Sequence, residues 1–145
     1  MSPRSGFVAT VGRVREIAAL AAEGERLGYE SAWVAETSGY DVVSLLTAMA
    51  ASTSRIRLGT GIAGVYLRSP LLMAMSANAI NEFSGGRLLL GLGTSTPFIV
   101  ERWHGLPWGR PLGHMRAYTE LLRRLLAGER VKSEGLYPIG AAQLL

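Results

Sequence analysis

Two short apolar segments, each ending in glycine and a hydroxyl residue, constrain the fold of this chain more than any other feature. Residues 55–62 read RIRLGTGI, and residues 87–95 read RLLLGLGTS. Continuous apolar runs of this length between helical segments are typical of strands that are buried on both faces of a parallel sheet. The glycines then lie at the carboxyl ends of two strands, which is where parallel α/β folds bind ligands. The pattern therefore predicts a small-molecule site at the strand ends.

Helical and extended segments alternate along the rest of the chain. Asp41 and Ser69 are candidate amino-terminal caps, Pro70 suits a first helical turn, and Gly28 is a candidate stop. This order implies right-handed crossovers and a parallel sheet, and hence an α/β fold. We expect helices over residues 14–27, 41–52, 70–83, 97–104 and 111–127. We expect strands over residues 30–36, 55–62 and 87–93, and a weak first strand within residues 6–10. Residues 129–138 are expected to make a short extended excursion, and no strand is expected over residues 140–145.

The composition limits the classes of partner. The chain has 145 residues, of which 48% are hydrophobic, so we expect one domain over residues 1–145 with a core of its own. The net charge of +4 is not gathered in runs, and the late arginines Arg116, Arg123 and Arg124 are spaced like a solvated helix face, so no nucleic-acid partner is expected. No apolar stretch reaches about 18 residues, which predicts no membrane partner. With no cysteine and no apolar leader, the expected location is cytoplasmic.

One glycine motif imitates a dinucleotide-binding loop. Residues 59–64 satisfy the pattern G-x-G-x-x-G. That pattern requires a helix to open at the glycines, so that its amino terminus meets the pyrophosphate. Here the next helix is expected only at Pro70, and the following strand ends in Thr94 rather than in an acid. Both departures argue against a dinucleotide site.

Several polar residues also have common structural explanations. Glu101 and His104 lie one helical turn apart, but two ligands do not make a metal site, so no metal is expected. Ser95 has no partner histidine in a recognisable arrangement, and His114 suits a helix surface better than the role of a base. Glu36 ends a buried strand, and two readings remain open: a structural carboxylate, or an acid of the site.

Five segments in a fixed order resemble one protein family. They are WVAE at residues 33–36, RIRLGTGI at 55–62, RSP at 68–70, SGGRLLLGLGTS at 84–95 and ERWHG at 101–105. Together they resemble the bacterial luciferase-like monooxygenase family, and most of all its deazaflavin-dependent oxidoreductase branch. The resemblance implies a (β/α)₈ TIM barrel that binds coenzyme F420, a deazaflavin, or alternatively FMN. The cofactor would lie at the carboxyl end of the barrel, where such proteins transfer a hydride or activate oxygen.

The resemblance also assigns roles to the strand ends. Glu36 and Thr37 match catalytic positions, although Thr37 stands where some relatives have a proton-donating histidine. A non-proline cis peptide makes a bulge at the end of the third strand in the deazaflavin branch, and the matching bond is Gly61–Ile62. The cofactor-binding positions implied in this chain are Gly61, Ile62, Ala63, Gly64, Thr94 and Ser95.

The chain is short for such a barrel, which takes about 250 residues. We therefore expect the amino-terminal half, with about four parallel strands and flanking helices. Four strands do not close a barrel, so one sheet face would stay open. The sequence predicts a homo-oligomer or association with a missing half-barrel. Three functions remain: hydride transfer between F420 and an unknown small-molecule substrate, an FMN-dependent monooxygenase, and a non-catalytic half-barrel that completes a partner. Residues of the open face are expected among Ala32, Val34, Ile56, Leu58, Leu88 and Leu90.

Overall fold

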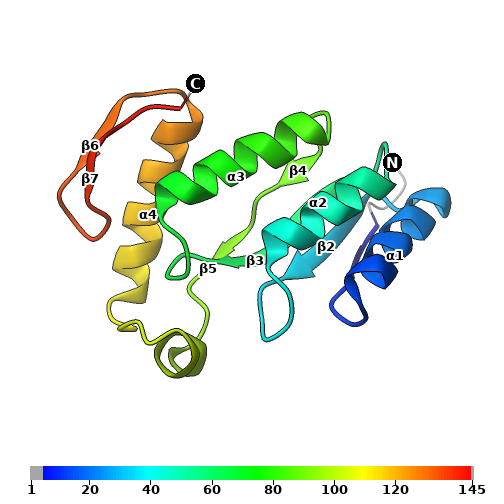
Figure 1. Cartoon of the computed structure of the whole chain (residues 1–145), viewed down its shortest axis with the longest axis horizontal. Helices are drawn as coiled ribbons and strands as arrows, with labels where there is room; N and C mark the ends of the chain where they lie inside the picture. The colour runs from blue at the N-terminus through cyan, green and yellow to red at the C-terminus, as the bar shows by residue number, and fades with distance from the viewer. Residues whose placement is uncertain (1–4, 145) are drawn as a thin grey trace. The chain divides into compact units, whose positions relative to one another are not determined.

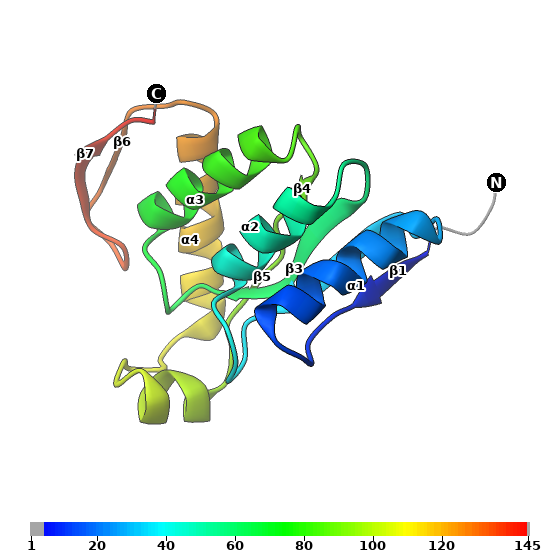
Figure 2. The ribbon, with the colours of Figure 1, turned by 45° about the vertical axis from the view of Figure 1, so that its right-hand side comes forward.

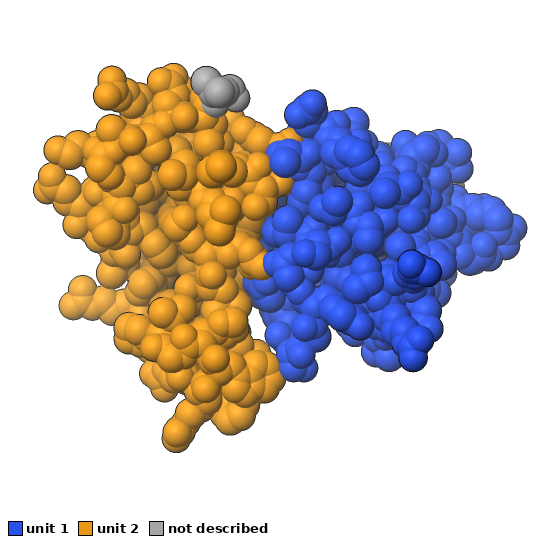
Figure 3. Space-filling model, in the orientation of Figure 1, with its two compact units in different colours: residues 1–63, 79–91 blue, residues 64–78, 92–145 orange. Residues whose placement is uncertain are grey.

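The computed structural model describes residues 5–144, which form two compact units. Unit 1 consists of the chain up to residue 63 together with residues 79–91, and unit 2 consists of residues 64–78 and the chain from residue 92 (Figure 3). The single domain expected over residues 1–145 stays a prediction. No helix within the described range is both long and apolar enough to cross a membrane.

Unit 1 is built on a parallel sheet with helices packed on it. The strands β1 (Gly6–Val8), β2 (Ser31–Ala35), β3 (Arg57–Gly64) and β4 (Leu88–Leu89) follow one another in chain order, each parallel to its neighbour. The helices α1 (Val14–Arg26) and α2 (Val42–Ser52) lie side by side on one face of this sheet (Figures 1 and 2). The parallel β/α order of a TIM-barrel half is thereby confirmed.

The helices begin and end where the polar signals place them. Asp41 caps α2, since its carboxylate accepts a hydrogen bond from the Ser44 N–H at 2.7 Å. Ser69 does the same for α3 (Pro70–Phe83), where its hydroxyl oxygen accepts from the Leu72 N–H at 3.1 Å. Gly28 has a φ of +85°, the left-handed conformation that ends a helix without strain for glycine.

Four of the six candidates for the open sheet face are buried. Ala32, Val34 and Leu58 are completely buried, and Ile56 is 2% exposed. These four therefore do not lie on an open face, whereas the other two candidates, Leu88 and Leu90, are half-buried. On the alternate positions Trp33 covers Gly59, where an added Cβ would overlap the indole ring, and its Nε1 donates to the Ser31 hydroxyl at 2.9 Å.

The end of β3 contains the expected bulge, but without the expected cis bond. Val34 pairs with Thr60 and Ala35 pairs with Ile62, so Gly61 is the extra residue of β3. The Gly61–Ile62 peptide is trans, and the prediction of a cis bond is wrong. The extra residue is accommodated by a shift of strand register. Beyond it the pairing resumes, because the Glu36 N–H donates to the Ile62 carbonyl at 2.9 Å.

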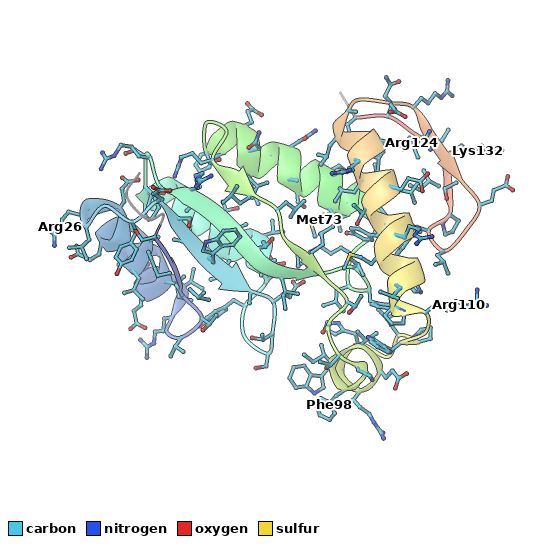
Figure 4. All side chains as sticks on the ribbon, turned by 180° about the vertical axis from the view of Figure 1, so that it is seen from behind. Arg26, Met73, Phe98, Arg110, Arg124 and Lys132 are labelled. Carbon is cyan, nitrogen blue, oxygen red and sulfur yellow. The ribbon has the colours of Figure 1, made fainter. Side chains whose placement is uncertain are left out.

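Unit 2 has a different construction. It contains the beginning of α3, the short strand β5 (Leu92–Gly93), a π-helix over Phe98–Trp103, α4 (Pro111–Leu126) and an antiparallel hairpin of β6 (Val131–Ser133) and β7 (Ile139–Ala142). Arg110 and Arg124, labelled in Figure 4, mark the two ends of α4. The strand β7 corrects the expectation that the carboxyl-terminal tail forms no strand. Its partner β6 confirms the extended excursion. The core of this unit includes Val65, Met73, Val100, Tyr118 and Leu125.

Candidate functional site at the carboxyl ends of the parallel strands

The ends of β2 and β3 bring four of the predicted site residues together in unit 1. The Glu36 N–H bonds to the Ile62 carbonyl, and this contact places Glu36 and Thr37 beside the bulge at Gly61. Ile62 is 40% exposed and Gly61 is also exposed, whereas Glu36 is half-buried. The backbone of Glu36 and the exposed Ile62 therefore lie next to the open backbone of Gly61 at the strand ends. Ala63, the next residue, is buried.

Gly61 is not required by the packing of the protein itself. A Cβ built at this position would lie 3.5 Å from the Val34 carbonyl oxygen and 4.0 Å from the Ala35 Cβ, which are ordinary contacts. The fold would therefore accept an alanine at this position. A glycine here leaves the backbone open to the close approach of a flat ligand. The two exposed residues, Gly61 and Ile62, thus fit a planar ring better than they fit a purely structural role.

A threonine hydroxyl interrupts the fourth strand, which the sequence predicts as continuous over residues 87–93. The Gly91 N–H donates to the Thr60 Oγ1 at 2.8 Å, and this hydroxyl donates to the Gly91 carbonyl at 2.7 Å. Thr60 is 1% exposed. The Thr60 side chain therefore takes the place of a backbone acceptor for the Gly91 N–H, whereas the Gly91 carbonyl also accepts from the Ala63 N–H at 2.9 Å. The strand divides into β4 and β5 at this point.

Replacement of Gly91 by alanine is expected to destabilise the protein by about 1–3 kcal/mol, because the new Cβ would overlap the Thr60 carbonyl oxygen. Backbone atoms cannot swing aside as a flexible side chain would. Gly39→Ala is the matched control, since a Cβ there has nothing within 4 Å. Urea denaturation followed by circular dichroism measures both variants, and equal midpoints would contradict the expected clash.

The remaining predicted site residues, Gly64, Thr94 and Ser95, belong to unit 2. The Val65 N–H donates to the Gly93 carbonyl at 3.0 Å, which joins the residue after Gly64 to the residue before Thr94. Gly64 is buried, whereas Thr94 and Ser95 are half-buried. Ser95 has a φ of +63°, a conformation that costs a residue other than glycine roughly 1–3 kcal/mol and persists where the surroundings impose it.

The structure also shows functional candidates that sequence reasoning missed. Tyr66, Trp108, His114 and Tyr137 form a cluster of rings in unit 2, next to the end of β3. His114 is not a plain surface residue, because it is half-buried and its Nδ1 lies 2.8 Å from the Tyr137 hydroxyl. Burial lowers the pKa of His114, which favours its neutral form. The position of Tyr66, two residues beyond the end of β3, was the available signal.

Among residues 5–144, no three His, Cys, Asp or Glu side chains lie close enough together to hold a metal ion.

Comparisons with known proteins show which family this chain is similar to. Residues 2–144 match the sequence model of a family described as luciferase-like monooxygenase. The chain is 37% identical over 122 residues to a 5,10-methylenetetrahydromethanopterin reductase of Archaeoglobus fulgidus, covering 83% of this chain and 36% of the relative. It superimposes with a TM-score of 0.88 and 28% identity on the coenzyme F420-dependent tetrahydromethanopterin reductase of Methanopyrus kandleri, covering 98% of this chain and 46% of that one.

More distant structures share the fold. The oxygenating component of 3,6-diketocamphane monooxygenase from Pseudomonas putida, in complex with FMN, superimposes with a TM-score of 0.84 at 17% identity, covering 99% of this chain and 44% of that one. The chain spans between 32% and 40% of the length of the first curated relatives that it matches.

Proposed function

Because the chain belongs to the luciferase-like monooxygenase family, we propose that it is the cofactor-binding half of an oxidoreductase that uses coenzyme F420. The site is the carboxyl end of its parallel strands. When bound, this deazaflavin supplies a ring carbon that exchanges a hydride with a small organic substrate. The observation that carries the proposal is the open backbone at Gly61 and Ile62, beside the Glu36 carboxylate.

Each group of this chain has a defined part in that proposal. Gly61 and Ile62 give the ring a flat, partly apolar surface to pack against. Thr94 and Ser95 offer hydroxyl groups that hydrogen-bond a polar edge of the cofactor. Glu36, with Thr37 next to it, holds a carboxylate at the strand end, where it orients the substrate or exchanges a proton with it.

The choice of F420 over FMN rests on two of the proteins that this chain is similar to. The Methanopyrus kandleri reductase named for coenzyme F420 is 28% identical to this chain, whereas the camphane monooxygenase in complex with FMN is 17% identical. That second likeness supports an FMN-dependent monooxygenase as the alternative. A flat tricyclic ring would fit the strand ends in either case, so the geometry of Gly61 alone does not choose between the two cofactors.

Titration of the purified chain with each cofactor, followed by fluorescence, tests the proposal. We expect tighter binding of F420 than of FMN. We also expect Gly61→Ala to weaken F420 binding by about 1 kcal/mol, roughly fivefold, because a methyl group then stands where the ring approaches the backbone. Thermal stability should be unchanged, since that Cβ makes only ordinary protein contacts.

Gly39→Ala, which adds a methyl group in open space, should leave binding as in the wild type. Tighter binding of FMN would overturn the preference for the deazaflavin. Failure of both cofactors to bind would favour the third alternative, a non-catalytic half-barrel.

We also propose that the chain associates with a second copy or with the missing half-barrel. Among the described strands, β1 and β4 end the hydrogen-bonded path of the sheet, and strand edges of this kind are templates for pairing. Val8 on β1 is 65% exposed, and Ile62 on β3 is 40% exposed. Light scattering coupled to size exclusion at low micromolar concentration should give a mass above that of the monomer. A monodisperse monomer that unfolds cooperatively would contradict this expectation.

A further inference from the structure

A chain of aromatic contacts supports the strand ends of unit 2. The Tyr66 ring lies 4.3 Å from the His114 ring and 6.4 Å from the Trp108 ring, measured between centroids, and it is stacked on Trp108 with an interplanar angle of 22°. The Tyr66 hydroxyl donates to the Gly109 carbonyl at 2.7 Å. The loop before α4 is therefore hydrogen-bonded to Tyr66, two residues beyond the end of β3.

Tyr137, in the hairpin of β6 and β7, is hydrogen-bonded to the residue that follows β3. Its hydroxyl donates to the Val65 carbonyl at 2.9 Å and lies 2.8 Å from the Nδ1 of His114. Since a phenol has one proton and the Val65 carbonyl receives it, the His114 Nδ1 must be the donor in the second bond. Burial, and then the nearby Tyr66, raise the pKa of Tyr137 to about 12, so this donor stays protonated at neutral pH.

Trp108 holds the other strand end. Its indole Nε1–H donates to the Thr94 carbonyl at 3.3 Å, immediately before the left-handed Ser95. Thr94 directly follows β5 and Val65 directly follows β3, and the bond from the Val65 N–H to the Gly93 carbonyl joins the two segments. The indole of Trp108 and the phenol of Tyr137 thus each bind one carbonyl at the place where the two strands end.

We infer that Trp108 and Tyr137 are positioning residues that hold the backbone of Thr94 and Ser95 in the conformation that contacts the cofactor. This inference rests on the proposed function for the identity of the ligand. Both side chains act through backbone carbonyls. The Ser95 backbone is the part that needs this support, because its positive φ does not persist without imposed contacts.

The deciding variant is Trp108→Phe, which keeps a ring against Tyr66 but removes the indole N–H. Trp103→Phe is its control, since Trp103 is 50% exposed and packs edge-on against Phe98. In the protein without cofactor, we expect the amide resonance of Ser95 to shift in Trp108→Phe and the Val65 amide to exchange its hydrogen about fivefold faster. Resonances of the buried residues Leu121 and Leu125 should stay in place, which a general loss of packing would not allow.

The second readout is affinity for coenzyme F420. Trp108→Phe should bind it about tenfold more weakly at an unchanged melting temperature, and Trp103→Phe should bind it as the wild type does. Tyr137→Phe, which loses the bond to the Val65 carbonyl, should show the same weakening. Unchanged Ser95 and Val65 signals in Trp108→Phe would overturn the inference, as would unchanged affinity. If the wild type binds no F420, the proposed function fails, and the Ser95 and Val65 signals alone decide whether Trp108 positions the strand end.

Discussion

Arg87→Ala is expected to lower the free energy of unfolding by about 3 kcal/mol, because this guanidinium joins three parts of unit 1. Its Nη1 donates to the Thr53 hydroxyl at 2.8 Å and to the Ile56 carbonyl at 2.9 Å. Its Nη2 donates to the Thr53 carbonyl at 3.0 Å, and its Nε donates to the Ser84 carbonyl at 2.6 Å. Alanine would leave these half-buried acceptors without their charged donor, at the amino-terminal end of the strands.

The several N–H donors of the Arg87 guanidinium contribute to stability as much as its charge does. Lysine has a single ammonium and cannot reach carbonyls on several sides at once, so Arg87→Lys should lose about half as much stability. Arg57→Ala is the control, because its Nη2 lies 3.6 Å from a Glu30 oxygen and both side chains are nearly half exposed. Exposed ion pairs of this kind contribute less than about 1 kcal/mol. Urea denaturation measures all three variants, and a loss in Arg87→Ala no larger than in Arg57→Ala would refute the assignment.

Glu25→Gln is expected to lower the free energy of unfolding by about 2 kcal/mol at pH 7. The Glu25 carboxylate, at the end of α1, accepts hydrogen bonds from the N–H groups of Arg55 at 2.6 Å, Ile56 at 2.8 Å and Ser54 at 3.0 Å. Burial alone would raise its pKa, but the bonds from Ile56, Arg55 and Ser54 outweigh that effect and lower the pKa from 4.5 to about 2. All three bonds end on Oε2, while Oε1 accepts from the Ser54 hydroxyl at 3.0 Å. A glutamine would lose the negative charge and would place an NH₂ donor where one of these oxygens accepts.

The same carboxylate makes stability depend on pH. Since the folded pKa of Glu25 is about 2 and its ordinary value is 4.5, the stabilisation is complete above pH 4.5 and is lost as the pH falls toward 2. The shift corresponds to at most about 3 kcal/mol, and the partial access of water reduces the expected value to about 2 kcal/mol. Wild type should therefore lose stability between pH 5 and pH 2 more steeply than Glu25→Gln does.

The control for this prediction is Glu23→Gln. Glu23 is exposed and bonds to Arg26 one turn along the same helix, so no measurable loss of stability is expected from its replacement. Chemical denaturation of the three proteins at several pH values provides the comparison. Parallel pH profiles for wild type and Glu25→Gln would contradict the role given to the Glu25 carboxylate.

Local signals predicted the helices and strands well, because their causes lie within a few residues. Asp41 and Ser69 cap the helices that they precede, and the glycine-terminated runs at residues 55–62 and 87–95 contain the strands of the site. The bulge at Gly61 was also placed correctly. Its trans geometry was not predicted, because an extra residue in a strand is accommodated either by a cis bond or by a register shift, and the local sequence is the same for both.

Features that depend on contacts distant in the sequence were missed. The break at Gly91 arises from the hydroxyl of Thr60, 31 residues earlier. The bond between Tyr137 and the Val65 carbonyl joins residues 72 positions apart, and no periodicity within either segment indicates it. The strand β7 lies in an apolar tail with little alternation, so only its pairing with β6 makes it extended. Assembly of the site therefore depends on the fold rather than on the local sequence.

We propose that the carboxyl ends of these parallel strands bind a deazaflavin. Hydrogen–deuterium exchange of the full chain, with and without saturating coenzyme F420, measures this binding segment by segment. We expect slower exchange in segments containing residues 36–37, 61–64 and 94–95, with no change around Glu25 and Arg87 at the opposite ends of the strands. Protection confined to the segments around Glu25 and Arg87, or no protection anywhere, would contradict it.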